Sequence, residues 1–241
     1  MRLDKYLADL QIGTRKEVKQ LLKQKRVKVN GSIVKDAKFQ VEATQDEVTF
    51  DEIPLVYQVN FYYEMNKPAG VLSATHDKVD DTVIDLLQPN DFRADLFPIG
   101  RLDKNTTGLL VISNDGQLAH RLLSPKHHVA KIYEAEVQGD VSAQDIAIFA
   151  EGIELEDFTT QPAQLEILKK ETSADQVVSL VRVTIAEGKF HQIKRMFKAV
   201  DKLVLTLKRV QMGGLVLDDQ LEPGTYRALT VDEIAMLEMK A

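Results

Sequence analysis

The stretch GRLDKNTTGLLVIS, residues 100–113, joins a polar loop to an apolar run. The run Leu109–Ile112 is short and wholly apolar, which is typical of a buried strand. In the loop before it, Asp103 lies between Arg101 and Lys104. Such a loop is typical of a solvated turn capped by the carboxylate, and also of an active site held at the edge of a sheet. The spacing alone leaves both interpretations open.

The composition limits the classes of protein to consider. The chain has 241 residues, 44% of them hydrophobic, which is enough for one large or two modest domains with a packed core. The absence of cysteine excludes disulfides, thiolate metal sites and thiol nucleophiles. The five histidines have no zinc-binding helical spacing, and we expect neither a metal nor a cofactor. We see no signal segment and no apolar run near the roughly 18 residues that span a membrane, so we expect a soluble, cytoplasmic protein.

The charge is distributed unevenly along the chain. The net charge is −6, but residues 1–40 carry 11 Lys and Arg against 4 Asp and Glu, a local charge of +7. A basic head on an acidic body indicates a module that binds a polyanion. The alternative is a chance cluster of solvated lysines.

The basic head has clear local signals. Apolar residues at helical spacing predict a helix from Leu3 to Leu10, which ends at Gly13. Thr14 and Glu17 form a capping-box pattern that begins a second helix. Two short apolar runs then flank Asn30-Gly31, a strong hairpin signal.

These letters, RLDKYLA and TRKEVKQLLKQKRVKVNG with a later D-E-V, resemble the S4 RNA-binding module over roughly residues 1–50. The resemblance implies that the cations of this head contact RNA phosphates, which position a protein without reading sequence. The cations in question are Arg15, Lys16, Lys19, Lys23, Lys25, Arg26 and Lys28.

The rest of the chain predicts a second domain of class α+β. An acidic, mixed stretch from residue 42 to 60 contains Pro54, and we expect domains at residues 1–59 and 60–241. Several strand-like runs follow one another without a helix between them, which favours a largely antiparallel sheet. Strands are expected at 61–65, 109–112, 132–137, 163–167, 177–185 and 203–210, and helices at 83–87, 117–123, 143–150 and 191–199.

Four stretches combine cations or an aromatic residue with turn residues: NKPAG (66–70), GRLDKNTTGLL (100–110), SPKHHVAKIYEAEV (124–137) and EGKFHQIKRMF (187–197). None is decisive alone, because each also fits ordinary surface charge. Together and in this order they resemble the motifs of pseudouridine synthases, whose signature is G-R-L-D-x-x-T-x-G-L. The segments SPKHHVAKIY and LKRVQMGGLVLDDQLEPGTYRALT resemble the RsuA-type branch, which modifies small-subunit ribosomal RNA.

The resemblance implies roles for individual residues. Asp103 would be the catalytic carboxylate, either a nucleophile or a base toward the sugar. Tyr133 would stack on the flipped base, and Lys194, with Arg195 as second choice, would be the basic partner of the carboxylate. Relatives often carry Arg at the position of Lys194, and an ammonium would not make the bidentate pair of a guanidinium. Further cations that would face the RNA or the flipped base are Arg101, Lys131, Lys67 and Arg209.

The function implied is the isomerisation of one uridine in 16S rRNA, at the site conventionally numbered 516. The alternatives are the same reaction on 23S rRNA, an assembly factor that binds RNA without catalysis, and a hydrolase that uses Asp103 with a histidine. The hydrolase ranks last because no histidine lies in a comparable motif. We expect a monomer acting on rRNA, either free or in an assembling particle.

Overall fold

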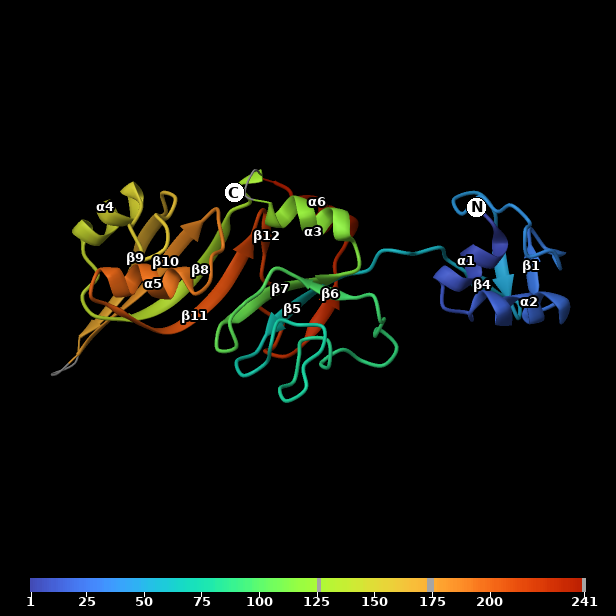
Figure 1. Ribbon diagram of the computed structural model, residues 1–241, viewed down its shortest axis with the longest axis horizontal. Helices are drawn as coiled ribbons and strands as arrows, with labels where there is room; N and C mark the ends of the chain where they lie inside the picture. Colours follow the sequence, from blue (N-terminus) through green and yellow to red (C-terminus); the bar gives the residue numbers. More distant parts are fainter. Residues whose placement is uncertain (125–126, 173–175, 240–241) are drawn as a thin grey trace. The chain divides into compact units, whose positions relative to one another are not determined.

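The computed structural model describes residues 1–124, 127–172 and 176–239. The chain divides into two compact units, Met1–Asn60 (unit 1) and Phe61–Ala241 (unit 2), which are coloured blue and turquoise to red in Figure 1. Each unit is described by itself.

Unit 1 packs two helices against a small antiparallel sheet. Helix α1 (Leu3–Asp9) precedes α2 (Arg15–Lys23), and the strand order is β2-β1-β3-β4. The predicted capping box at Thr14 is confirmed: Glu17 N donates to Thr14 Oγ1 at 3.3 Å, and Thr14 N donates to Glu17 Oε2 at 2.7 Å. The predicted hairpin is also confirmed, because Asn30 and Gly31 have positive φ angles of 50° and 75° between β1 and β2. The strands are β1 (Val27–Val29), β2 (Ser32–Ile33), β3 (Val48–Phe50) and β4 (Ile53–Leu55).

Strands β3 and β4 lie in the acidic stretch for which no strand was predicted. Pro54 belongs to β4, the last strand of the sheet, where a residue without an N–H group is tolerated. Short strands with few apolar residues give little periodic signal, so the sheet neighbours decide this segment.

Unit 2 is built on one sheet of nine strands. The path is β13-β5-β7-β11-β8-β10-β9, with β12 paired to β11 and β6 paired to β7. Only the β7–β11 pair is parallel among these strands of the described residues, which confirms the expected α+β class with a mostly antiparallel sheet. The strands are β5 (Tyr62–Lys67), β6 (Phe97–Ile99), β7 (Thr107–Ser113), β8 (Lys131–Gln138), β9 (Gln164–Thr172), β10 (Val177–Ile185), β11 (Leu203–Met212), β12 (Leu215–Val216) and β13 (Tyr226–Ala228).

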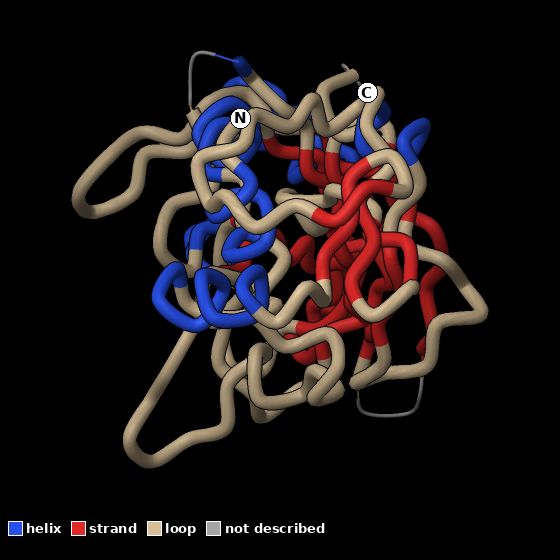
Figure 2. Tube along the Cα trace, turned by 90° about the vertical axis from the view of Figure 1, so that its right-hand side faces the viewer, coloured by secondary structure: helices blue, strands red, loops and turns tan. Residues whose placement is uncertain are grey.

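Two apolar cores lie on opposite sides of β7. Leu110 and Ile112 belong to one core, and Leu109 and Val111 belong to the other. Both faces of β7 are therefore buried, as the apolar run predicts. The first core includes α4 and α5, and the second includes α3 and α6; all four helices are labelled in Figure 1. Figure 2 shows the helices in blue and the strands in red. The helices are α3 (Gly116–Leu123), α4 (Ala143–Glu151), α5 (Gln192–Ala199) and α6 (Val231–Met236).

The helix predicted at residues 83–87 is wrong. This segment forms turns, in which Thr82 N and Oγ1 both donate to Asp85 Oδ2, at 2.8 and 2.7 Å. Val83, Ile84 and Leu87 pack into the first core. Five residues are too few for a stable helix without further support, and the Asp85 carboxylate favours a turn.

Gly108 explains how the loop of Asp103 enters β7. Its φ is +96°, and a Cβ placed on it would lie 2.3 Å from the backbone oxygen of Arg209 on β11. Only glycine allows this approach of the two parallel strands. The close contact between the backbones of β7 and β11 therefore fixes the point at which the loop of Asp103 joins β7.

Candidate active site

Asp103 lies in a pocket of unit 2 that is formed by the loop before β7, the strands β8, β10 and β11, and the start of α5. Its side chain is one-quarter exposed. The pocket is lined by Arg101, Leu102, Asp103, Thr106, Tyr133, Ile185, Gly188, Lys189, His191, Gln192, Ile193 and Leu207. Residues from four of the predicted motifs thus meet in one cavity or support it.

Helix α5 supplies the basic groups beside Asp103. Lys194 Nζ donates to Asp103 Oδ2 at 2.7 Å, and His191 Nε2 lies 3.6 Å from Asp103 Oδ1. The two residues are three positions apart, so they face the same side of the helix start. Thr106 Oγ1 adds a long contact of 3.4 Å to Oδ2.

Arg195, the second choice for the basic partner, points elsewhere. Its guanidinium pairs with Asp157 and lies over the ring of Phe158, 5.1 Å from the ring centroid. One position along a helix turns a side chain by about 100°, so Lys194 and Arg195 cannot both face Asp103. The pairing of Arg195 with Asp103 is therefore wrong, and Lys194 takes that place.

His191 was missed as a neighbour of Asp103. It lies within the quoted motif EGKFHQIKRMF, although the sequence gives no histidine in a motif comparable to that of Asp103. In the structure His191, the residue before α5, lies beside the Asp103 carboxylate although the two residues are 88 positions apart in the sequence. Such a separation leaves no local signal.

Tyr133 enters the pocket from β8. Its residue is only 7% exposed, and its ring packs in the first core while lining the cavity. Alternation along the strand gives every second side chain to this face. The ring is therefore held by packing and presents an aromatic surface close to the carboxylate.

Lys67 does not face RNA, contrary to the prediction. Its side chain is fully buried, and Nζ donates to the backbone oxygens of Pro68 (2.8 Å), Lys104 (3.1 Å) and Thr106 (3.0 Å). Burial lowers the pKa of Lys67 to about 8, with the Asp103 charge raising it and the Lys194 charge lowering it. Lys67 thus ties the loop that follows Asp103 to the end of β5.

Two further contacts hold the same loop, and neither was foreseen. Gly70 N donates to Lys104 O at 2.8 Å. Ser73 Oγ donates to Leu102 O at 3.0 Å and accepts from Leu102 N at 3.1 Å. Gly70 of the segment NKPAG and the nearby Ser73 therefore help to hold the loop of Asp103 in place.

Lys131 and Arg209 are also buried, and neither lines the pocket. Lys131 Nζ donates to Val129 O at 3.0 Å, and Arg209 Nε donates to Leu109 O at 2.7 Å. Burial, and then the charge of Arg209, lower the pKa of Lys131 to about 8. The expectation that these two cations contact RNA directly is wrong, because both side chains lie on the faces of their strands that point into the protein.

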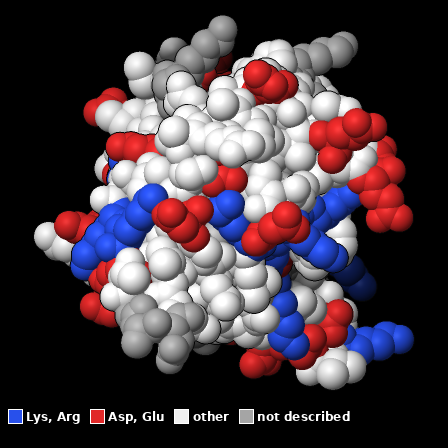
Figure 3. Space-filling view, turned by 90° about the vertical axis from the view of Figure 1, so that its left-hand side faces the viewer, with Lys and Arg blue, Asp and Glu red and all other residues white. Residues whose placement is uncertain are grey.

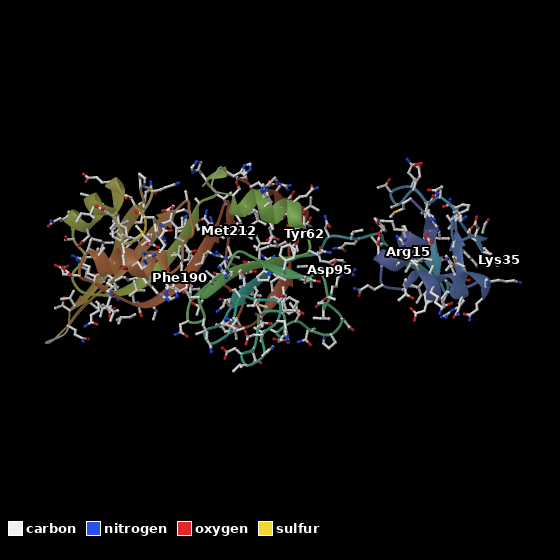
Figure 4. The ribbon with its side chains drawn as sticks, viewed as in Figure 1. Arg15, Lys35, Tyr62, Asp95, Phe190 and Met212 are labelled. Carbon is white, nitrogen blue, oxygen red and sulfur yellow. The ribbon has the colours of Figure 1, made fainter. Side chains whose placement is uncertain are left out.

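The predicted cations of unit 1 mostly remain at its surface. Arg15, which Figure 4 labels, and four lysines are exposed. Arg26 pairs with Asp51 and Lys28 with Glu52, both on the β3–β4 turn, so these two charges are partly neutralised within the unit. The exposed lysines are Lys16, Lys19, Lys23 and Lys25.

Unit 2 has a mixed surface on the face shown in Figure 3, where Lys and Arg side chains alternate with Asp and Glu. In the described ranges, no group of three or more His, Asp and Glu side chains is placed to hold a metal ion. Helices long and apolar enough to cross a membrane are absent from the same ranges.

Comparison with known proteins shows what the whole chain is similar to. The model of the family "RNA pseudouridylate synthase" matches residues 62–199, and the S4 domain matches residues 1–48. The chain is 48% identical to an uncharacterized RNA pseudouridine synthase of Bacillus subtilis and 41% identical to ribosomal small subunit pseudouridine synthase A of Yersinia pestis. Each alignment covers at least 97% of both chains. A crystal structure of a pseudouridylate synthase is 39% identical, covers 98% of this chain and 99% of its own, and has a TM-score of 0.66.

Proposed function

Because the chain belongs to the RNA pseudouridylate synthase family, we propose that it converts one uridine of 16S rRNA to pseudouridine, with Asp103 as the catalytic carboxylate. The observation that carries the proposal is the pocket in which Asp103, Lys194 and Tyr133 meet. The resemblance to the RsuA-type branch favours position 516 of that RNA.

The reaction explains why a carboxylate is needed. The bond between N1 and C1′ of the uridine breaks, the uracil turns, and C5 bonds to C1′. The proton that C5 loses is balanced by a proton gained at N1. A carboxylate contributes either by attacking C1′ or by taking a proton from the sugar.

The two oxygens of Asp103 are placed differently. Oδ2 accepts from Lys194 at 2.7 Å, whereas Oδ1 accepts no hydrogen bond from the described residues and has His191 at 3.6 Å. Oδ1 is therefore the oxygen available to the sugar. Lys194 fixes the orientation of the carboxylate and balances its charge beside RNA phosphates.

Tyr133 and Arg101 fit the handling of the base. A uridine must leave its stack to reach Asp103, and an aromatic ring then replaces part of the lost stacking. The Tyr133 ring borders the same cavity as Asp103. Arg101 is exposed at the rim of this pocket, where a guanidinium suits a phosphate or the gap that the base leaves.

Unit 1 is proposed to hold the RNA and unit 2 to catalyse. Exposed cations on α2 supply the phosphate contacts, and none of them belongs to the pocket. A ribosomal RNA substrate implies a cytoplasmic protein, and we propose that it acts as a monomer on free RNA or on an assembling particle.

The test is pseudouridine mapping of rRNA from cells that lack the protein and from cells complemented with the parent, Asp103→Asn or the exposed control Asp219→Asn. We expect pseudouridine at position 516 with the parent and the control and none with Asp103→Asn, while Asp103→Asn still binds the RNA. Turnover by Asp103→Asn within tenfold of the parent would contradict the role of Asp103. Loss of a 23S pseudouridine instead would move the substrate to the large subunit, and unchanged rRNA would favour a factor that binds without catalysis.

A further inference from the structure

An exposed aromatic ring lies two residues before the start of α5. The ring of Phe190 is 74% exposed, although the core of unit 2 takes up most other large apolar side chains. It stacks on the imidazole of His191, with ring centroids 3.8 Å apart and planes at 20° (Phe190 is labelled in Figure 4). One face of a phenyl ring in this arrangement remains open to solvent.

The stacked pair extends outward from the pocket. His191 lines the cavity and lies 3.6 Å from Asp103, whereas Phe190 is not among the lining residues. Phe190 therefore stacks on a residue of the pocket without lining the pocket itself. The backbone of His191 is in the left-handed region, with φ 50° and ψ 28°, a conformation that side-chain-bearing residues rarely adopt.

A cation accompanies the pair. Lys189 also lines the pocket, and its Nζ lies over the ring of Phe158, 5.7 Å from the centroid. Lys189 directly precedes Phe190 in the chain and is exposed. An aromatic ring and a cation at neighbouring positions suit single-stranded RNA, because the ring can stack on a base and the cation can contact a phosphate.

We propose that Phe190 and His191 form a stacking site for the base of a nucleotide next to the isomerised uridine. This inference rests on the proposed function. When the uridine leaves its stack, a neighbouring base loses one stacking partner, and the Phe190 ring replaces it at the rim of the pocket. Every base has an aromatic face, so the site accepts any base and gains most from a purine.

The first test compares single-turnover rates on an rRNA fragment that contains the mapped uridine. Phe190→Ala and Phe190→Leu should both reduce kcat/KM by about tenfold or more, because leucine keeps apolar bulk but has no aromatic face. Phe190→Trp should stay within about threefold of the parent. Phe92→Ala removes another exposed aromatic, 50% exposed and not lining the pocket, and should have no effect.

The second test removes the proposed partner from the RNA. Fragments with an abasic nucleotide directly before or directly after the uridine are assayed with the parent and with Phe190→Ala. On one of these fragments the parent should slow to the rate of the variant, and the substitution should then have little further effect. Thermal unfolding of each variant shows that its fold is retained, as expected for an exposed side chain.

The outcomes separate this inference from the proposed function. If the parent isomerises the uridine and Phe190→Ala or Phe190→Leu matches it, the stacking site is refuted while the function stands. The same holds if Phe190→Ala remains equally defective relative to the parent on both abasic fragments. If the parent forms no pseudouridine in any rRNA, the proposed function fails and the stacking site fails with it.

Discussion

The fully buried Lys67 leads to a pH-dependent prediction for the stability of unit 2. Burial lowers the pKa of Lys67 from 10.5 to about 8. At about 1.4 kcal/mol per pKa unit, the buried charge costs about 3 kcal/mol relative to the same charge in the unfolded chain. Below pH 8 the lysine is charged in both states, and this cost is present in full.

The sign of the pH effect follows from the depressed pKa. Between about pH 8 and pH 10.5 the unfolded chain holds a proton on Lys67 that the folded chain has released. The free energy of unfolding therefore rises with pH across this window through Lys67. At pH 9.5 about 2 kcal/mol of the cost is removed.

Replacing Lys67 by Met removes the charge and its hydrogen bonds together. Each buried carbonyl that loses its hydrogen-bond partner lowers the free energy of unfolding by about 1–3 kcal/mol, but Lys104 O would still accept a hydrogen bond from Gly70 N. At pH 7 the loss of these hydrogen bonds and the removal of the buried charge act in opposite directions, so the free energies of unfolding of Lys67→Met and the parent should agree to within about 2 kcal/mol. At pH 9.5 the parent should gain about 2 kcal/mol relative to Lys67→Met.

The assay is urea denaturation at pH 7 and pH 9.5, followed by near-ultraviolet circular dichroism of the tyrosines. The exposed Lys198 provides the matched control, because Lys198→Met removes one lysine without disturbing a buried group. The difference in the free energy of unfolding between Lys198→Met and the parent should be the same at both pH values. A Lys67→Met difference that stays constant between pH 7 and pH 9.5, or that changes in the opposite direction, would refute the reasoning.

Three further outcomes are expected. Tyr133→Ala should slow single-turnover pseudouridine formation about fivefold or more, because base–aromatic stacking is worth about 1–3 kcal/mol, and an unchanged rate would remove Tyr133 from the site. Tyr133→Phe separates the ring from the hydroxyl, since loss of a hydroxyl that moves a proton would make this variant roughly 10²–10⁴-fold slower than the parent. Gly108→Ala should lower the free energy of unfolding by more than about 2 kcal/mol in urea denaturation, because a Cβ would meet the β11 backbone at 2.3 Å. A change below about 0.5 kcal/mol, which is typical of surface substitutions, would contradict the importance of that contact. Lys19→Gln should reduce the slope of log K for RNA binding against log salt concentration by about 0.7–0.9. Arg26→Gln should reduce this slope less because Arg26 is already paired with Asp51, and a larger effect at Arg26 would argue against RNA binding by the exposed cations of unit 1.

Local patterns in the sequence were enough to predict the main elements. The capping box at Thr14 and the turn at Asn30-Gly31 each depend on residues a few positions apart, so their letters carry the full signal. The run Leu109–Ile112 is apolar at every position, and that pattern is typical of a strand covered on both faces, as observed. The family motifs then identified Asp103 as the acid to examine.

Tertiary structure decided which side chains reach the carboxylate. The sequence ranked Lys194 ahead of Arg195 as the partner of Asp103 but kept both, and the orientation of α5 places Lys194 beside Asp103 and Arg195 beside Asp157. His191 comes to the carboxylate through the same orientation, and this proximity could not be predicted from its own motif.

The burial of cations was likewise invisible in the sequence. A lysine at the end of a strand is usually solvated, so Lys67 and Lys131 were assigned to the RNA. The fold instead supplies backbone carbonyls for each ammonium, which a local pattern cannot show because Lys67 and Thr106 are 39 residues apart. The sequence predicted most of the elements because these depend on neighbours along the chain, and its motifs singled out Asp103 as the candidate acid. The fold decided which side chains contact that acid, because those contacts form only when distant segments pack.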